Sequence, residues 1–221
     1  MQETILIVGD SLGLPRENMP YEKTWPRLVS KFTGSHVVAK VQRALTTAML
    51  HSGMYQDWLE FYAPKMVMLQ VGIVDCAPRY IKNGGIAMKL LGVSPGPVKS
   101  AAWKIIKKGG RQAKHADVSP VDFEANLKKY ADRCIKAGVQ QLLLISIARS
   151  GSAMVKSNPG ILDQVERYNG IIRRVAASYP ICSVIDVLAE ADDSYFLEDG
   201  YHLNEYGNLQ LFNALIKYIN P

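Results

Sequence analysis

Short, mainly apolar runs recur along the chain and alternate with helical patterns. The clearest runs are residues 5–8, 66–72 and 141–147. A strand that is buried on both faces shows such a run, whereas a half-exposed strand alternates apolar and polar residues. Together with shorter strands over residues 36–41 and 183–187, these runs predict a five-stranded parallel sheet in a three-layer α/β/α sandwich.

Amphipathic spacing and capping residues predict helices between the strands. We expect helices over residues 21–32, 46–62, 119–136, 161–178 and 205–219. Ser119 followed by Pro120 is a strong start signal, because serine caps a helix and proline fits its first turn.

Length and composition favour one globular domain over residues 1–221. Apolar residues make up 48% of the chain and charged residues 21%, which is ordinary for such a domain. There is no run of about 20 apolar residues that would span a membrane. No basic segment followed by an apolar one precedes the first strand, so we expect a cytoplasmic location. Three cysteines form no even disulfide framework.

The positive charge is concentrated in one segment. The chain carries a net charge of +6, and no acidic residue lies between Asp75 and Asp117, whereas nine lysines and arginines do. Residues 81–116 also contain several Gly and Pro turn signals, and two short helices are expected there, over residues 87–91 and 101–108. We predict a basic insertion, which is either a solvated surface excursion or a substrate lid. A basic surface spread around a nucleic-acid-binding module is not indicated.

Asp10 and Ser11 follow the first strand directly. In open α/β sheets ligands bind at the carboxyl ends of the strands, so a serine at this position can serve as a nucleophile. The alternative is that Asp-Ser only caps a helix. The sequence Asp199-Gly200-Tyr201-His202 near the other end favours the catalytic interpretation.

Gly9-Asp10-Ser11 near the start and Asp199 to His202 near the end resemble blocks I and V of the SGNH (GDSL) hydrolases. The resemblance implies that Ser11 is the nucleophile, His202 the general base and Asp199 the carboxylate that orients it. A hydroxyl needs a base to take its proton, and a carboxylate fixes the tautomer of that base. It also implies the flavodoxin-like strand order 2-1-3-4-5.

Two blocks of the family pattern are altered. Block II supplies a glycine N–H to the oxyanion hole, and here Ala44 stands at that position, so we expect Ser11 and Ala44 to form the hole. The change is tolerable if Ala44 has a negative φ. Block III supplies an asparagine, but this chain has Val74, which cannot donate a hydrogen bond. Either another donor such as Arg43, Thr46 or Arg79 replaces it, or the site has drifted from hydrolysis to binding.

Further residues are expected to converge on the same sheet edge and to contact substrate. They are Asp10, Arg43, Thr46, Gly72, Val74, Asp75, Arg79 and Arg149. Arg79 and Arg149 could hold an anionic group through bidentate contacts, or form structural ion pairs.

The resemblance predicts a serine esterase that removes a small acyl group, acetyl by preference, from a carbohydrate or a related polar substrate. The start Gly-Asp-Ser-Leu-x-Leu-Pro-Arg is similar to that of proteins associated with bacterial surface-glycan synthesis. As a lid, the basic insertion could contact an anionic, lipid-linked glycan. The alternatives are an O-acyltransferase acting on a sugar hydroxyl and a catalytically silent glycan-binding protein. No cofactor or metal is expected.

Overall fold

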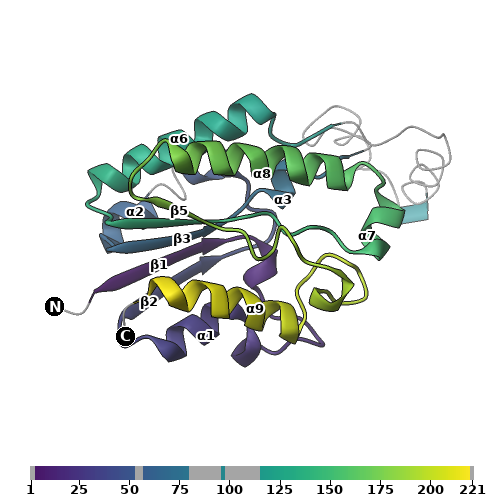
Figure 1. Cartoon of the computed structure of the whole chain (residues 1–221), viewed down its shortest axis with the longest axis horizontal. Helices are drawn as coiled ribbons and strands as arrows, with labels where there is room; N and C mark the ends of the chain where they lie inside the picture. The colour runs from purple at the N-terminus through teal and green to yellow at the C-terminus, as the bar shows by residue number, and fades with distance from the viewer. Residues whose placement is uncertain (1–2, 53–56, 80–95, 98–114, 220–221) are drawn as a thin grey trace.

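The computed structural model describes residues 3–52, 57–79, 96–97 and 115–219, and within them it contains one five-stranded parallel sheet (Figure 1). The strand order is β2-β1-β3-β4-β5, as the resemblance implies. The strands are β1 (Thr4–Gly9), β2 (His36–Val41), β3 (Met66–Gln70), β4 (Gln141–Ile145) and β5 (Cys182–Ile185). The predicted α/β/α fold class is therefore confirmed.

Helices cover both faces of the sheet. In Figure 1, α1 (Trp25–Phe32) and α9 (Glu205–Leu215) lie side by side on one face, and α6 (Pro120–Lys136) and α8 (Ile161–Ala177) lie together on the other. The shorter helices are α2 (Asp57–Tyr62), α3 (Ile73–Cys76) and α7 (Ser152–Ser157). None of the helices in the described ranges has the length and apolar character needed to cross a bilayer.

The core is built from the two faces of the central strands. In β1, Leu6, Ile7 and Val8 are fully buried, which is the reason that this strand reads as an uninterrupted apolar run. The helices contribute large side chains, such as Trp25 of α1, which is fully buried. Burial of this apolar area supplies the main driving force for folding.

Two predicted helices are wrong in extent. The segment 21–32 divides into a 3-10 turn (Tyr21–Lys23) and α1, because Pro26 lacks an N–H and fits only the first turn of a helix. The segment 46–62 begins as a 3-10 helix, η3 (Thr47–His51), and its α-helical part starts only at Asp57. The backbone N–H of Thr47 donates to the side chain of Asp75. This bond anchors the start of η3.

The predicted insertion falls mostly on residues outside the described ranges, including the two short helices expected at 87–91 and 101–108. Its two ends are described. Arg79 and His115 form an antiparallel bridge, with N···O distances of 2.8 and 3.2 Å. The Arg79 Nε also donates to Asp117 Oδ2 at 2.6 Å. Arg79 is therefore held to the segment 115–117 by both its backbone and its side chain.

The backbone of the turn after β3 predicts that substitution of Gly72 lowers the stability of the protein. Its φ is 123°, and a Cβ there would lie 2.6 Å from Ile147 Cδ1. Gly72→Ala is expected to lower the free energy of unfolding by roughly 1–3 kcal/mol, because the backbone conformation disfavours L side chains and the contact is too close. Denaturant unfolding measures this. Gly34→Ala, where a Cβ would meet nothing within 4 Å, is the control and should change stability little. Equal effects would contradict the assignment of strain to Gly72.

Candidate active site

Ser11 lies at the carboxyl end of the central strand β1, in a short 3-10 helix, η1 (Ser11–Gly13). Asp10 caps this turn, since its Oδ1 accepts a hydrogen bond from the Leu12 N–H at 2.9 Å. The Asp10 N–H itself donates to the Gln70 carbonyl of the neighbouring strand β3 at 3.0 Å. The serine is thus fixed to the sheet edge by its own neighbours, with 7% of its surface exposed.

His202 and Asp199 lie in a tight turn in front of α9. The turn is closed by hydrogen bonds from the Leu197 N–H to the His202 carbonyl (2.8 Å) and from the Gly200 N–H to the Leu197 carbonyl (2.9 Å). Gly200 adopts φ 65°, a left-handed conformation that glycine accepts without cost. Asn204 then caps α9 through the Gly207 N–H, so the helix start fixes the far side of the turn.

The structure brings Ser11, His202 and Asp199 together. Ser11 Oγ lies 3.3 Å from His202 Nε2, and His202 Nδ1 lies 2.6 Å from Asp199 Oδ2. The other oxygen, Asp199 Oδ1, accepts from the backbone N–H groups of Tyr201 and His202, each at 2.9 Å. The carboxylate is therefore held on both oxygens, and it selects the imidazole tautomer that carries its proton on Nδ1.

The surroundings keep His202 neutral. Burial, the largest effect, lowers the pKa of the imidazole, and the nearby Arg16 and Arg43 lower it further, whereas Asp199 raises it. At neutral pH the Nε2 lone pair is thus available to accept a proton.

Arg16 is the main functional residue that sequence reasoning missed. Its Nη2 contacts His202 Nε2 and lies 3.4 Å from the Ser11 carbonyl oxygen. The guanidinium therefore shares the imidazole nitrogen with the serine hydroxyl. Arg16 is the last residue of the Gly-Asp-Ser-Leu-x-Leu-Pro-Arg motif. The motif therefore contained it, but no role was assigned to it.

Tyr201 was also not assigned, although it stands inside the Asp199 to His202 motif. Its ring packs edge-on against the His202 imidazole, with ring centroids 4.3 Å apart. Burial raises the pKa of its phenol, so the hydroxyl stays protonated. Its contribution is to hold the plane of the imidazole.

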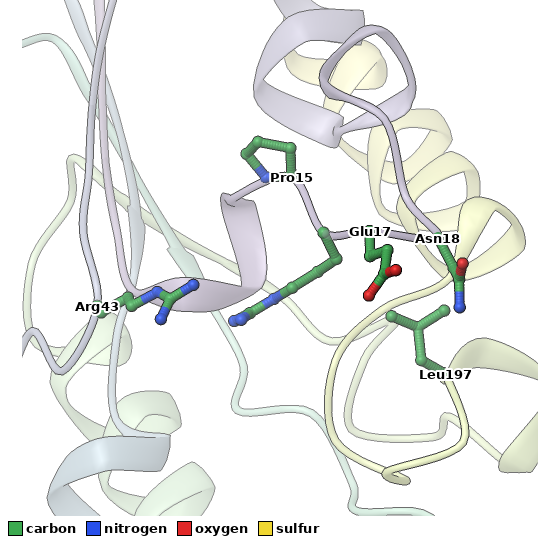
Figure 2. A pocket seen from close by; sticks show the side chains of 6 residues that line it. Pro15, Glu17, Asn18, Arg43 and Leu197 are labelled. Atoms are coloured by element: carbon green, nitrogen blue, oxygen red, sulfur yellow. The ribbon is translucent and has the colours of Figure 1, made fainter.

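A pocket of about 630 Å³ opens beside these residues. Figure 2 shows Arg43 reaching toward its middle from the loop after β2, with Glu17 and Leu197 on the other side. The lining residues are Pro15, Arg16, Glu17, Asn18, Arg43 and Leu197. Its walls thus carry two arginines and one glutamate.

Backbone N–H groups are the available donors for an oxyanion. Within the described ranges, no atom accepts a hydrogen bond from the N–H of Ser11 or of Ala44. Ala44 has φ 59°, so the condition of a negative φ is not met, and an L residue here occupies the left-handed region. Val74 lies in α3 with 8% of its surface exposed.

Two acidic residues that were expected to contact substrate are buried in the structure. Asp10 is 1% exposed and Asp75 is fully buried. Asp75 Oδ1 accepts from both the N–H (2.8 Å) and the hydroxyl (2.6 Å) of Thr47, which ties the loop carrying Ala44 to α3. Burial raises the pKa of Asp10 to about 7 and that of Asp75 to about 6, and the charge of Asp75 contributes to the shift at Asp10.

The remaining predicted contacts fall at different places. Arg79 is engaged in its ion pair with Asp117, as the structural alternative expected. Arg149 lines another cavity, of about 470 Å³, together with Asp192 and Asp193, and not the pocket of Figure 2. Gly72 is buried at the end of β3, and Thr46 is half-buried at the start of η3. Of the predicted substrate contacts, Arg43 alone lines the pocket next to His202.

Comparisons with known proteins identify the fold. No family model matches the chain, and no curated protein matches it. Among solved structures, an acetylxylan esterase from Geobacillus stearothermophilus is similar, with 16% identity, a TM-score of 0.64, and 97% of this chain and 93% of that chain covered. A lipase/acylhydrolase from Enterococcus faecalis has 14% identity and a TM-score of 0.63, with 98% and 95% covered.

A third similar structure is an α/β hydrolase enzyme from the metagenome of Lake Arreo, Spain. It has 17% identity and a TM-score of 0.63, with 97% of this chain and 94% of that chain covered. At these identities the comparison shows a shared fold over nearly the whole of both chains. The protein therefore has the fold of these esterases and hydrolases.

The buried carboxyl of Asp10 predicts a pH-dependent stability. Its folded pKa of about 7 lies above the usual 3.8, so its contribution to stability is complete below about pH 4 and is lost as the pH rises through 7. Asp10→Asn keeps the acceptor for Leu12 and removes the charge. We expect it to raise the free energy of unfolding most above about pH 7, with the gain disappearing toward about pH 4.

Denaturant unfolding at several pH values checks this expectation. Asp163→Asn, which removes an exposed carboxylate from the first turn of α8, is the control for loss of charge and should show no such trend. A gain at Asp10 that does not vary with pH would contradict the proposed burial of charge.

The positive φ of Ala44 predicts that Ala44→Gly stabilises the protein. Relief of the left-handed conformation should raise the free energy of unfolding by about 1 kcal/mol. Ala125→Gly, at an exposed position within α6, is the matched control and should lower it by about 0.5–1 kcal/mol. If both changes destabilise alike in denaturant unfolding, Ala44 is not strained.

Proposed function

We propose that this chain is a serine esterase of the SGNH type that removes a small acyl group from a polar alcohol. The observation that carries the proposal is the contact of Ser11 Oγ with His202 Nε2, with Asp199 on the opposite ring nitrogen. This is the geometry of a hydroxyl nucleophile, its base and an orienting carboxylate. The esterase fold of the similar structures agrees with it.

In the first half of the reaction Ser11 Oγ attacks the ester carbonyl carbon, and His202 Nε2 takes the hydroxyl proton. The carbonyl π electrons move to oxygen, where the N–H groups of Ser11 and Ala44 stabilise the oxyanion. When the tetrahedral intermediate collapses, the bond to the alcohol oxygen breaks. His202 then gives its proton to that oxygen, and the alcohol leaves from an acyl-serine.

In the second half water replaces the alcohol. His202 Nε2 takes one proton from water as its oxygen attacks the acyl carbon, and it returns that proton to Ser11 Oγ when the ester bond to the enzyme breaks. The carboxylic acid leaves and the serine is restored. Asp199 stays ionised and stabilises the imidazolium that forms twice in the cycle.

For the substrate we propose an acetyl ester of a carbohydrate or a related polar molecule. The family resemblance and the similarity to an acetylxylan esterase fold support this class. The alcohol half would lie in the pocket beside His202, whose lining includes two arginines, one glutamate and one asparagine.

A second candidate is a binding protein without turnover. Two observations favour it: Arg16 occupies His202 Nε2 together with Ser11, and Val74 stands where the family has an oxyanion-donating asparagine. The two candidates differ in whether Ser11 reacts.

Labelling with a fluorophosphonate tests the serine. We expect one label per chain, at Ser11, and none in Ser11→Ala. Ser150→Ala is a matched control because Ser150 is also 7% exposed, and it should label as the wild type does. Turnover of a short-chain aryl ester should fall at least about 10³-fold in Ser11→Ala and His202→Ala, and less in Asp199→Ala, since the orienting carboxylate costs least.

The outcomes separate the candidates. Labelling and turnover that both disappear in Ser11→Ala support the esterase. A wild-type protein that neither labels nor turns over an ester is instead the binding protein.

A further inference from the structure

Arg16 and Arg43 bring unneutralised charge to the pocket beside the candidate nucleophile. Within the described ranges neither guanidinium forms an ion pair with a carboxylate, although both line the same pocket. Five other arginines are paired: Arg27 with Glu22, Arg79 with Asp117, Arg133 with Glu60, Arg173 with Glu166 and Asp186, and Arg174 with Glu124. Of the described residues, Glu17 is the only acidic one that lines the pocket, so it offsets the charge of one of the two pocket arginines.

The hydrogen-bonding capacity of Arg16 is only partly used. Its Nε is buried and has no acceptor among the described residues, while its Nη2 contacts a ring nitrogen and a backbone carbonyl. A buried donor without a partner is costly, and a guanidinium is built to hold an oxyanion with two parallel bonds. A ligand that carries a hydrogen-bond acceptor would therefore satisfy the Arg16 Nε in this pocket.

We propose that this pocket is a subsite for a singly charged oxyanion, such as a carboxylate, on the alcohol half of the ester. The inference rests on the proposed function and names its substrate class. Two arginines and one glutamate give the lining side chains a net charge of +1, which one negative charge balances.

The position of Arg16 places the anion on the alcohol half. His202 Nε2 hands its proton to the leaving alcohol oxygen, so that oxygen must lie next to Nε2. Arg16 contacts this same nitrogen, and the pocket extends from Arg16 toward Arg43 and Leu197. The group attached to the alcohol oxygen therefore enters the pocket, whereas the acyl carbon lies at Ser11.

Anion binding would also release the base. In the structure the Arg16 guanidinium competes with Ser11 for the Nε2 lone pair. A carboxylate that takes the Arg16 donors draws the guanidinium away from the imidazole. The correct substrate thus completes the contact between base and nucleophile.

Matched esters test the subsite. We compare kcat/KM for meta-acetoxybenzoate with that for meta-acetoxybenzamide, which differ in charge on the alcohol half. The wild type should prefer the charged ester, and Arg43→Gln should lower the ratio of the two values about tenfold, whatever it does to each rate. Arg167→Gln, an exposed and unpaired arginine of α8 outside the pocket, is the control and should leave the ratio unchanged.

Two further variants sharpen the test. Arg43→Lys keeps the charge but not the planar fork, so it should retain part of the preference. Glu17→Gln removes the negative charge of the lining and should raise the ratio. A wild-type ratio at or below one, equal losses for both esters in Arg43→Gln, or a lower ratio in Glu17→Gln would overturn the proposal.

A second pair of esters tests the acyl half. Phenyl hydrogen adipate and the corresponding amide carry the difference in charge on the acyl side. We expect Arg43→Gln to leave the ratio of their kcat/KM values unchanged. A preference that appears here and disappears in Arg43→Gln would overturn the placement on the alcohol half.

A binding measurement separates failure of the subsite from failure of the esterase. Ser11→Ala cannot turn over, so calorimetry with the products meta-hydroxybenzoate and meta-hydroxybenzamide reports the pocket alone. We expect tighter binding of the benzoate, weakened about tenfold when Arg43→Gln is added. Equal binding of both products overturns the subsite. Benzoate preference in a protein whose wild type neither labels nor turns over supports the subsite and rejects the esterase.

Discussion

Everything at the candidate site depends on β1 lying inside the sheet, between β2 and β3, with both faces covered. The strand pairs with β2 on one side and β3 on the other, and Leu6, Ile7 and Val8 are fully buried. Such a strand cannot shift its register without exposing an apolar side chain. Core packing therefore places the residues at its end, Asp10 and Ser11, and the hydrogen bonds of Asp10 to Leu12 and Gln70 hold the turn that follows.

The architecture was predictable because its signals are local and strong. Uninterrupted apolar runs mark buried strands, and Ser119-Pro120 marks the start of α6 at the observed residue. The error over residues 46–62 arose because a residue distant in sequence determines the backbone conformation there. Nothing near Thr47 in sequence announces that Asp75 anchors it, so the 3-10 turn there could not be distinguished from the expected α-helix.

Prediction of the site was uneven for the same reason. The resemblance named residue types by position, and Ser11, Asp199 and His202 lie together. It could not tell which polar residues at the sheet edge are accessible: Asp10 and Asp75 proved to be interior groups, and Arg79 is held by Asp117. Arg16 was missed because its role depends on a fold that brings it to a histidine 186 residues away.

The site balances two opposite electrostatic demands on one imidazole. Burial, and to a smaller extent the arginines beside the pocket, favour the neutral form of His202, whereas Asp199 stabilises its protonated form. A base that must accept and release a proton in each half-reaction works best when neither form is strongly favoured. The loop that carries Ala44 is held by the buried contact between Asp75 and Thr47.

The bridge between Arg79 and His115 has a consequence for how this fold can change. The entropic cost of closing a loop grows only with the logarithm of its length, so each doubling costs roughly 0.6 kcal/mol. Arg79 and His115 pair through their backbones. The bridge therefore fixes the distance between these two residues, however many residues lie between them. For the closure entropy alone, doubling or halving the number of residues between Arg79 and His115 changes the free energy of folding by only this small amount.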